Sequence, residues 1–182
     1  GPREVAILAD SSANAAFVAA DLLSQAEHGA DSQVMLVSDS EELIKKVQDE
    51  LVKQTAALPR KEIIGQALQN SKAVVTRSAG EAIDLLNEYA PEHLILSCEN
   101  AGTVAEKVIN AGSVFLGHYS PESVGDYASG TNHTLPTNGY ARMYSGVSVD
   151  SFVKKITFQE LSETGLKNIS NTVIIMAEAE GL

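Results

Sequence analysis

Short runs of apolar, β-branched residues alternate along the chain with longer amphipathic stretches. This alternation predicts βα units stacked on a mostly parallel sheet, and the nearly continuous apolar character of each short run indicates strands covered on both faces. We expect about five strands, at residues 5–9, 33–37, 73–76, 93–97 and 113–116. Helices are expected between them, at residues 14–25, 41–57, 62–69, 80–89 and 103–110. The predicted fold class is therefore α/β, with helices on both faces of the sheet in three layers.

After the fifth predicted strand the pattern changes. Residues 117–146 are rich in Gly, Ser, Tyr, Asn and Pro and have no sustained period, which is typical of a long functional loop. Residues 151–182 are predicted to form a C-terminal helical region. The chain has no internal repeat, low-complexity tract or dividing linker, so we expect a single domain over residues 1–182.

The overall charge narrows the possible partners. The chain has 182 residues, of which 13 are Lys or Arg and 24 are Asp or Glu, giving a net charge of −11. This charge repels nucleic-acid phosphates and anionic lipids, so neither nucleic acid nor a membrane surface is an expected partner. No apolar run approaches the roughly 20 residues that span a bilayer, and a soluble protein is expected.

The single cysteine, Cys98, excludes an intrachain disulfide and is compatible with a reducing, cytoplasmic setting. We interpret it as a buried core thiol. The chain opens on Gly1-Pro2-Arg3-Glu4 without a methionine and stops on Gly181-Leu182 directly after a predicted helix. We therefore expect a fragment of a longer protein.

Ligands of an open parallel α/β sheet bind outside the carboxyl ends of the strands. We therefore expect chemistry at the positions following the strand ends, helped by whatever the long loop brings over that edge of the sheet. These strand ends are Ala9, Val37, Thr76, Ser97 and Leu116.

Three groups of polar residues could carry chemistry. Gln25 and His28 lie three residues apart on a predicted helix, so they share one face and could bind one metal ion. The alternative is that His28 only marks the carboxyl end of the helix, where the dipole favours an imidazole. On spacing alone both interpretations stay open.

Glu92 and His93 follow Pro91 at the start of a predicted strand. An adjacent carboxylate and imidazole suit proton transfer, although a polar loop before a strand is an equally simple explanation. The long loop adds Asp126 and His133, seven positions apart, which could equally belong to an ordinary surface loop.

Several common sites are missing from the sequence. No G-x-G-x-x-G follows the first predicted strand, and no G-x-x-x-x-G-K-[ST] occurs anywhere. No G-x-S-x-G elbow is present, and Cys98 has no nucleophile signature around it. Ordinary dinucleotide and triphosphate cradles and the usual nucleophilic triads are therefore excluded.

Taken together, four long motifs resemble the histidinol dehydrogenase family, in the right order and over essentially the whole chain. They are DLLSQAEHG at residues 21–29, PEHL at 91–94, GSVFLG at 112–117 and GDYASGTNHTLP at 125–136. The resemblance implies an incomplete Rossmann-like domain whose long loop, residues 117–146, belongs to the active site. It also implies NAD⁺-linked, zinc-dependent oxidation of L-histidinol to L-histidine in histidine biosynthesis.

The resemblance assigns roles residue by residue. Gln25, His28 and Asp126 would be zinc ligands, with the amine and imidazole of the substrate completing the coordination. Glu92 would be the general base that activates water for the second oxidation, and His93 would handle the alcohol proton and contact the substrate. His133 would contact the substrate as well.

The chain also departs from the family pattern. The fourth zinc ligand of the family is a histidine in a C-terminal tail contributed by the other subunit of a homodimer, and most of the NAD⁺ site lies in an N-terminal region. Arg3 stands where the family usually has a small hydroxyl residue. We therefore expect weak zinc binding and little turnover from this chain alone. The alternatives are a catalytically silent α/β domain and a flavodoxin-like module that binds a small molecule.

Overall fold

A parallel sheet organises the first of two compact units in the computed structural model, which describes residues 3–182. The units are Gly1–Ser148 and Val149–Leu182, and each is described by itself. The sheet has the order β3-β2-β1-β4-β5, and every neighbouring pair is parallel. Its strands are β1 (Glu4–Ala9), β2 (Gln33–Ser38), β3 (Lys72–Val75), β4 (His93–Ser97) and β5 (Ser113–Leu116). The predicted α/β class and all five strands are confirmed within one residue at each end.

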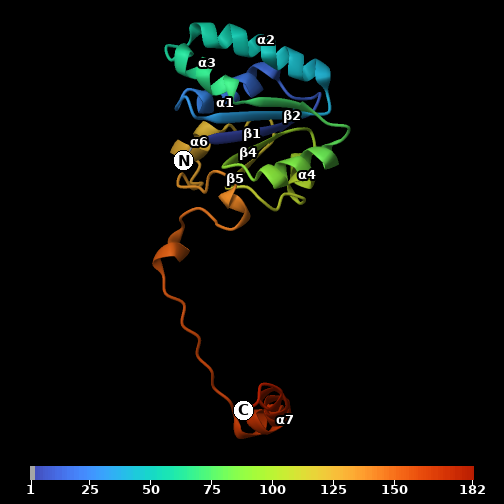
Figure 1. The fold of residues 1–182 in the computed structure, drawn as a ribbon, viewed down its shortest axis with the longest axis vertical. Helices are drawn as coiled ribbons and strands as arrows, with labels where there is room; N and C mark the ends of the chain where they lie inside the picture. The colour runs from blue at the N-terminus through green and yellow to red at the C-terminus, as the bar shows by residue number, and fades with distance from the viewer. Residues whose placement is uncertain (1–2) are drawn as a thin grey trace. The chain divides into compact units, whose positions relative to one another are not determined.

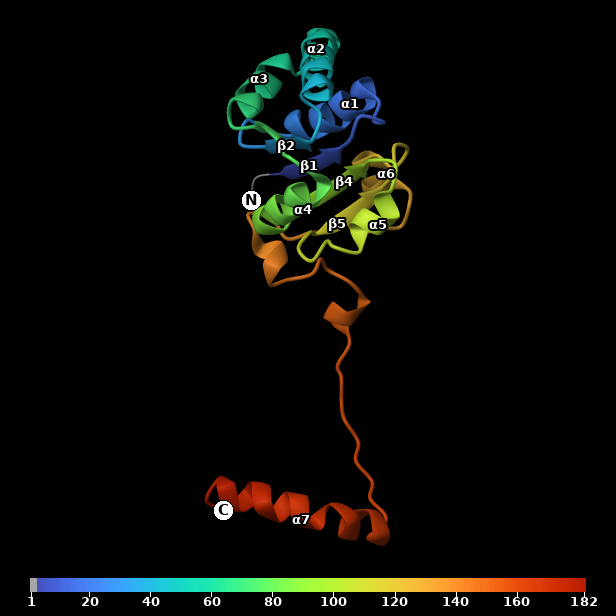
Figure 2. The same ribbon diagram turned by 90° about the vertical axis from the view of Figure 1, so that its right-hand side faces the viewer.

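Helices cover both faces of this sheet, as predicted (Figures 1 and 2). On one face lie α1 (Ala15–Ala26), α2 (Glu41–Ala57) and α3 (Lys61–Gln69), and on the other lie α4 (Ala79–Tyr89) and α5 (Ala101–Ala105). A short helix, α6 (Glu122–Tyr127), packs beside α1. The result is the three-layer, Rossmann-like arrangement expected from the sequence.

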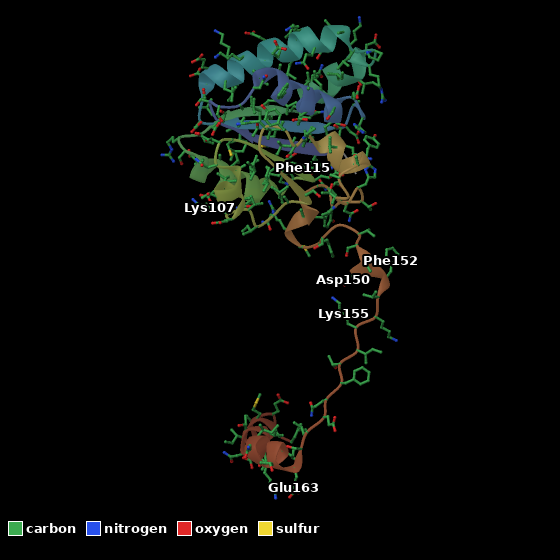
Figure 3. The ribbon with its side chains drawn as sticks, turned by 180° about the vertical axis from the view of Figure 1, so that it is seen from behind. Lys107, Phe115, Asp150, Phe152, Lys155 and Glu163 are labelled. Carbon is green, nitrogen blue, oxygen red and sulfur yellow. The ribbon has the colours of Figure 1, made fainter. Side chains whose placement is uncertain are left out.

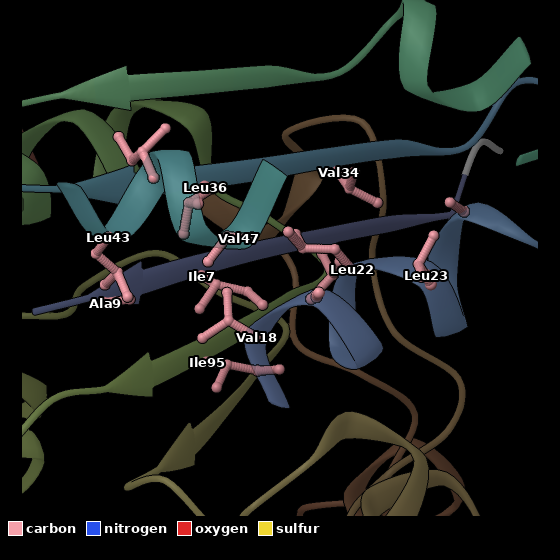
Figure 4. Close-up of a cluster of buried hydrophobic side chains, with 14 of the residues drawn as sticks. Ile7, Ala9, Val18, Leu22, Leu23, Val34, Leu36, Leu43, Val47 and Ile95 are labelled. Carbon is pink, nitrogen blue, oxygen red and sulfur yellow. The ribbon is translucent and has the colours of Figure 1, made fainter. Parts of the chain in front are cut away.

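The alternation of side chains along β1 divides the core into two halves. Val5, Ile7 and Ala9 face α1 and α2 and belong to one buried cluster. Figure 4 shows Ile7 and Ala9 packed with side chains such as Leu22 and Val47. Ala6 and Leu8 face the opposite way and pack with residues of α4 and β4. Both halves are apolar because β1 is the central strand and water reaches neither of its faces.

Cys98 belongs to the second half of the core and is buried, as interpreted from the sequence. Burial, together with the nearby charge of Asp10, raises the pKa of its thiol to about 11. The thiol therefore stays protonated at neutral pH.

The predicted helix at residues 103–110 is wrong at both ends, because α5 spans only Ala101–Ala105. The early carboxyl end is explained by Asn87 of α4, whose Oδ1 accepts hydrogen bonds from the backbone N–H groups of Ile109 and Asn110 at 2.9 and 3.3 Å. Its Nδ2 donates to the carbonyl of Lys107 at 3.0 Å. These bonds satisfy the backbone beyond α5 without a helix.

The segment at residues 117–146, predicted to be a loop, contains α6 and a short 3₁₀ helix, Tyr140–Arg142. Beyond α6 the chain crosses the amino ends of the strands. The backbone N–H of Asn138 donates to Oε1 of Glu4 at 2.9 Å, and a Cβ added at Gly112 would come within 3.2 Å of Leu135. This crossing decides where the polar residues of the loop meet the sheet.

The second unit contains a 3₁₀ helix, Val149–Phe152, and α7 (Glu163–Ala179). The helical region predicted over residues 151–182 is therefore only partly helical, because residues 153–162 have no helix. Asp150 and Lys155 pair at 3.6 Å (Figure 3), and α7 buries none of its residues. Among the helices described over residues 3–182, none is long and apolar enough to cross a membrane.

Two isoleucines allow a matched test of the core. Ile7 is fully buried at the centre of the sheet, whereas Ile109 is 76% exposed. We expect Ile7→Ala to lower the free energy of unfolding by about 2–5 kcal/mol, since it removes buried methylenes and leaves a cavity. Ile109→Ala should change it by less than about 0.5 kcal/mol. Urea denaturation measures both, and equal losses would show that the core does not lie at β1.

Candidate functional site

The backbone of Glu4 gathers three of the candidate side chains at the start of β1. Its N–H donates to Oε2 of Glu92 at 3.1 Å. Its carbonyl accepts from Nδ1 of His93 at 3.1 Å and from Nε2 of Gln25 at 3.3 Å. Because β1 and β4 pair in parallel from Val5 and His93 onward, the two strand starts lie side by side. The end of α1 brings Gln25 to the same place.

Nδ1 of His93 contacts two groups: the Glu4 carbonyl at 3.1 Å, which can only accept, and Nε2 of Gln25 at 3.2 Å, which can only donate. In the tautomer that bonds to the Glu4 carbonyl, Nδ1 carries the hydrogen and Nε2 presents a lone pair. Burial lowers the pKa of His93, which favours this neutral form. Nε2 is buried and has no hydrogen-bond partner among the described residues. The imidazole therefore aims an unsatisfied acceptor into the interior of the protein.

Two carboxylates face that lone pair from α6. Oε1 of Glu122 and Oδ1 of Asp126 each lie 3.8 Å from Nε2 of His93. The three ligand atoms lie within 4.8 Å of one another, a spacing at which they could hold a metal ion. Burial and the neighbouring Asp126 carboxylate raise the pKa of Glu122 to about 7. Three acceptors facing one another in the interior favour a cation or a shared proton between them.

Gln25 and His28 lie beside this cluster. Gln25 is fully buried, and its Oε1 has no hydrogen-bond partner in the described part of the chain. Nδ1 of His28 donates to the carbonyl of Ser24 at 2.7 Å, which leaves Nε2 free to bind a metal. His28 is exposed, and it lies near enough to Glu122 for a positive charge on its ring to oppose the burial-driven rise in the pKa of that carboxyl group.

The outer side of Asp126 meets two basic side chains. Its Oδ2 lies 3.0 Å from Nδ1 of His133 and 3.9 Å from Nη1 of Arg3. The spacing of Asp126 and His133 in the sequence thus corresponds to direct contact. All six predicted site residues gather in one region, with His28 and His133 at its exposed margin.

The expected position of the site, at the carboxyl ends of the strands, is wrong for this cluster. Glu92 and His93 stand at the amino end of β4, and Glu4 opens β1. A helix that follows a strand in a parallel βα unit runs back toward the amino ends of the sheet, so the last turn of α1 lies there. The loop after α6 crosses to the same edge, as the bond from Asn138 to Glu4 shows.

Proton transfer suits the inner part of this cluster. Burial raises the pKa of Glu92 above its usual value, although its bond from Glu4 opposes the shift. The same burial keeps His93 neutral, with a free lone pair. A buried carboxylate and a buried imidazole thus stand side by side, with Oε2 and Nδ1 3.8 Å apart, and these are the two groups most used in general acid–base catalysis.

The sequence prediction did not include Glu122. This residue is buried, and Oγ of Ser24 lies 3.2 Å from its Oε2. The available signal was its position four residues before Asp126, which places both carboxylates on one helix face if the segment is helical. The absence of a sustained period hid that helix, which spans only Glu122–Tyr127.

Comparison with known proteins gives one consistent family. A family model described as histidinol dehydrogenase matches residues 1–182. A Bacteroides thetaiotaomicron histidinol dehydrogenase is 61% identical over 180 residues, covering 99% of this chain and 42% of the relative. The chloroplastic histidinol dehydrogenase of Arabidopsis thaliana is 55% identical, covering 100% of this chain and 39% of the relative.

A solved structure agrees with these relatives. The crystal structure of histidinol dehydrogenase from Elizabethkingia anophelis is similar to the whole chain, with a TM-score of 0.94 and 57% identity, and 42% of that structure is covered. The chain thus spans about two fifths of the length of the curated relatives it matches.

The carboxyl group of Glu122 predicts a dependence of stability on pH in the metal-free protein. Its pKa is raised from 4.5 to about 7, so the folded state holds this proton more tightly than the unfolded state does. The resulting stabilisation is fully present below pH 4.5 and is lost as the pH rises through about 7. We expect Glu122→Gln to match the unmodified protein near pH 4, below the unfolded pKa of 4.5. Near pH 8, with EDTA present, it should be more stable by about 1–3 kcal/mol.

Denaturation curves at the two pH values measure this difference. The exposed Glu106 offers a matched control, since Glu106→Gln should leave both curves unchanged. A Glu122→Gln protein that is less stable at pH 8 would contradict the raised pKa.

Proposed function

Since the chain belongs to the histidinol dehydrogenase family, we propose that it supplies the metal-binding and acid–base part of a site that oxidises L-histidinol to L-histidine. The observation that carries this proposal is the buried cluster of His93, Glu122 and Asp126, whose acceptor atoms face one another. Catalytic zinc sites are built from such imidazole and carboxylate ligands.

We propose that Gln25, His28 and Asp126 hold Zn²⁺. Two observations support this set: Oε1 of Gln25 is a buried acceptor without a described partner, and the tautomer of His28 leaves Nε2 free. When bound, the ion would supply positive charge that holds the amine and imidazole of the substrate. Glu122 lies next to the set and would add negative charge to the site.

His93 is proposed to take the alcohol proton of histidinol at Nε2. The bond from Nδ1 to the Glu4 carbonyl holds the ring in the required tautomer, and burial keeps it neutral. Glu92 is proposed to remove a proton from the water that attacks the intermediate aldehyde before the second oxidation. Its burial favours a carboxylate basic enough for that step. His133, through its contact with Asp126, would help to position the substrate.

NAD⁺ is proposed as the hydride acceptor in both oxidations, bound mainly by parts of the relatives that this chain does not span. A homodimer is proposed as well, in keeping with the resemblance. It is supported by the apolar side chains that α7 exposes at helical spacing, among them Leu166, Ile169 and Val173. A cytoplasmic setting remains the proposal for a chain whose one thiol is buried and free, although the Arabidopsis relative is named chloroplastic.

Zinc titration distinguishes the proposed ligand set from an alternative set made of His93, Glu122 and Asp126. We expect His28→Ala to weaken Zn²⁺ binding about 10-fold or more, because it removes a ligand. His93→Gln should weaken binding much less, because that residue is proposed to move a proton. Competition with a chromophoric chelator measures both constants. The reverse order would assign the metal to His93, Glu122 and Asp126.

Activity can be tested in a chimera. The matching 180 residues of the Bacteroides thetaiotaomicron relative would be replaced by this chain, which is 61% identical to them. We expect the chimera to form NADH from L-histidinol. Glu92→Gln and His93→Asn should each lower kcat about 10²–10⁴-fold, the usual loss when a general acid or base is removed.

Glu106→Gln serves as the control in the chimera and should leave kcat unchanged. A folded chimera that forms no NADH would contradict the proposed function. Full activity without Glu92 and His93 would contradict the roles assigned to them.

A further inference from the structure

The side chain of Arg3 enters the cluster from the segment just before β1. It is one-third exposed as a whole, at 33%, but its Nη1 is buried and has no hydrogen-bond partner among the described residues. Its acidic partner is Asp126, whose Oδ2 lies 3.9 Å from Nη1 of Arg3. That distance is too long for a hydrogen bond, so the attraction between the two groups is one of charge alone.

The positive charge of Arg3 acts on more than one group of the site. Burial raises the pKa of Glu92, and the charge of Arg3 partly opposes that rise. Burial lowers the pKa of His93, and the charge of Arg3 adds to that fall by opposing a second positive charge nearby. The guanidinium thus imposes on the cluster part of the field that a metal ion would impose. An arginine, unlike a lysine or histidine, does not lose its proton in a protein, so the positive charge of Arg3 would remain beside a bound metal ion.

Asp126 stands between the two positions for positive charge. Its Oδ1 faces Nε2 of His93 at 3.8 Å, on the side where the acceptors converge. Its Oδ2 faces Arg3 and His133 on the other side. The Asp126 carboxylate therefore faces the acceptors of His93 and Glu122 on one side and the guanidinium on the other. A cation bound at Oδ1 and the guanidinium of Arg3 would both be attracted to this one carboxylate.

We propose that Arg3 is a built-in electrostatic competitor of the metal ion. It compensates the charge of Asp126 in the metal-free protein and lowers the affinity of the site for divalent cations. The inference rests on the metal site proposed above. It predicts that removing a side chain from the site tightens metal binding, which loss of structure cannot produce.

Three variants of the metal-stripped chain test this role. Arg3→Met removes the charge and keeps an apolar stem, and Arg3→Lys keeps the charge. Arg77→Met is the control, since Arg77 is 90% exposed and pairs with Glu81. Zn²⁺ affinity would be measured by competition with a chromophoric chelator, and the coordination would be compared through the absorption spectrum of bound Co²⁺.

We expect Arg3→Met to bind Zn²⁺ about 10-fold more tightly than the unmodified chain, the scale expected for charges several ångströms apart at an effective dielectric of about 20. Arg3→Lys should stay within about 3-fold of the unmodified chain. Arg77→Met should not change the affinity, and all Co²⁺ spectra should agree.

Equal or weaker Zn²⁺ binding by Arg3→Met would overturn the competitor role while leaving the metal site in place. A changed Co²⁺ spectrum in that variant would show that Arg3 positions Asp126 as a ligand, and this would overturn the role too. Failure of every protein to bind Zn²⁺ would overturn the proposed metal site and this inference with it.

Discussion

The site depends on a set of buried acceptors that cannot satisfy one another. Nε2 of His93 and the carboxylates of Glu122 and Asp126 converge without a donor among them, apart from a proton that the two acids can share. Desolvated acceptors of this kind raise the free energy of the folded state unless a cation or proton joins them. The paired starts of β1 and β4 hold the ring through the contact of Nδ1 with the Glu4 carbonyl, and α6 carries both carboxylates.

The opposite edge of the sheet shows what a satisfied polar cluster looks like. At the carboxyl ends, the Asp10 carboxylate accepts from the backbone N–H groups of Ser12 and Glu99 at 2.9 and 3.0 Å. The ring of His118 contacts the hydroxyls of Ser97 and Ser12 at 3.0 and 3.1 Å. These hydrogen bonds tie the loops at the carboxyl edge together. A cavity lined by residues such as Ala9, Ser38 and Asn100 remains beside them, at the carboxyl ends of the strands.

The local pattern of apolar and polar residues was enough to predict the sheet and most helices, because strand burial and helix periodicity depend on residues close together in the sequence. It was not enough where distant residues decide the outcome. The end of α5 depends on Asn87, which lies in another helix, and the burial of Glu122 depends on Ser24 and the ring of His93. The candidate residues were found through short motifs and the family resemblance. Their meeting place at the amino edge required the path of the loop, which no local pattern contains.

Packing beneath the site couples it to the core. The ring of Phe115 on β5 lies 6.1 Å from that of His93, centroid to centroid, and Figure 3 marks its place within the unit. Gly125 of α6 approaches the ring of Phe115 so closely that a Cβ added at Gly125 would lie 2.4 Å from that ring. Glycine is required there to bring α6 near the sheet, and α6 carries both Glu122 and Asp126. The close approach of Gly125 to Phe115 therefore helps to set the distance between the imidazole and the carboxylates.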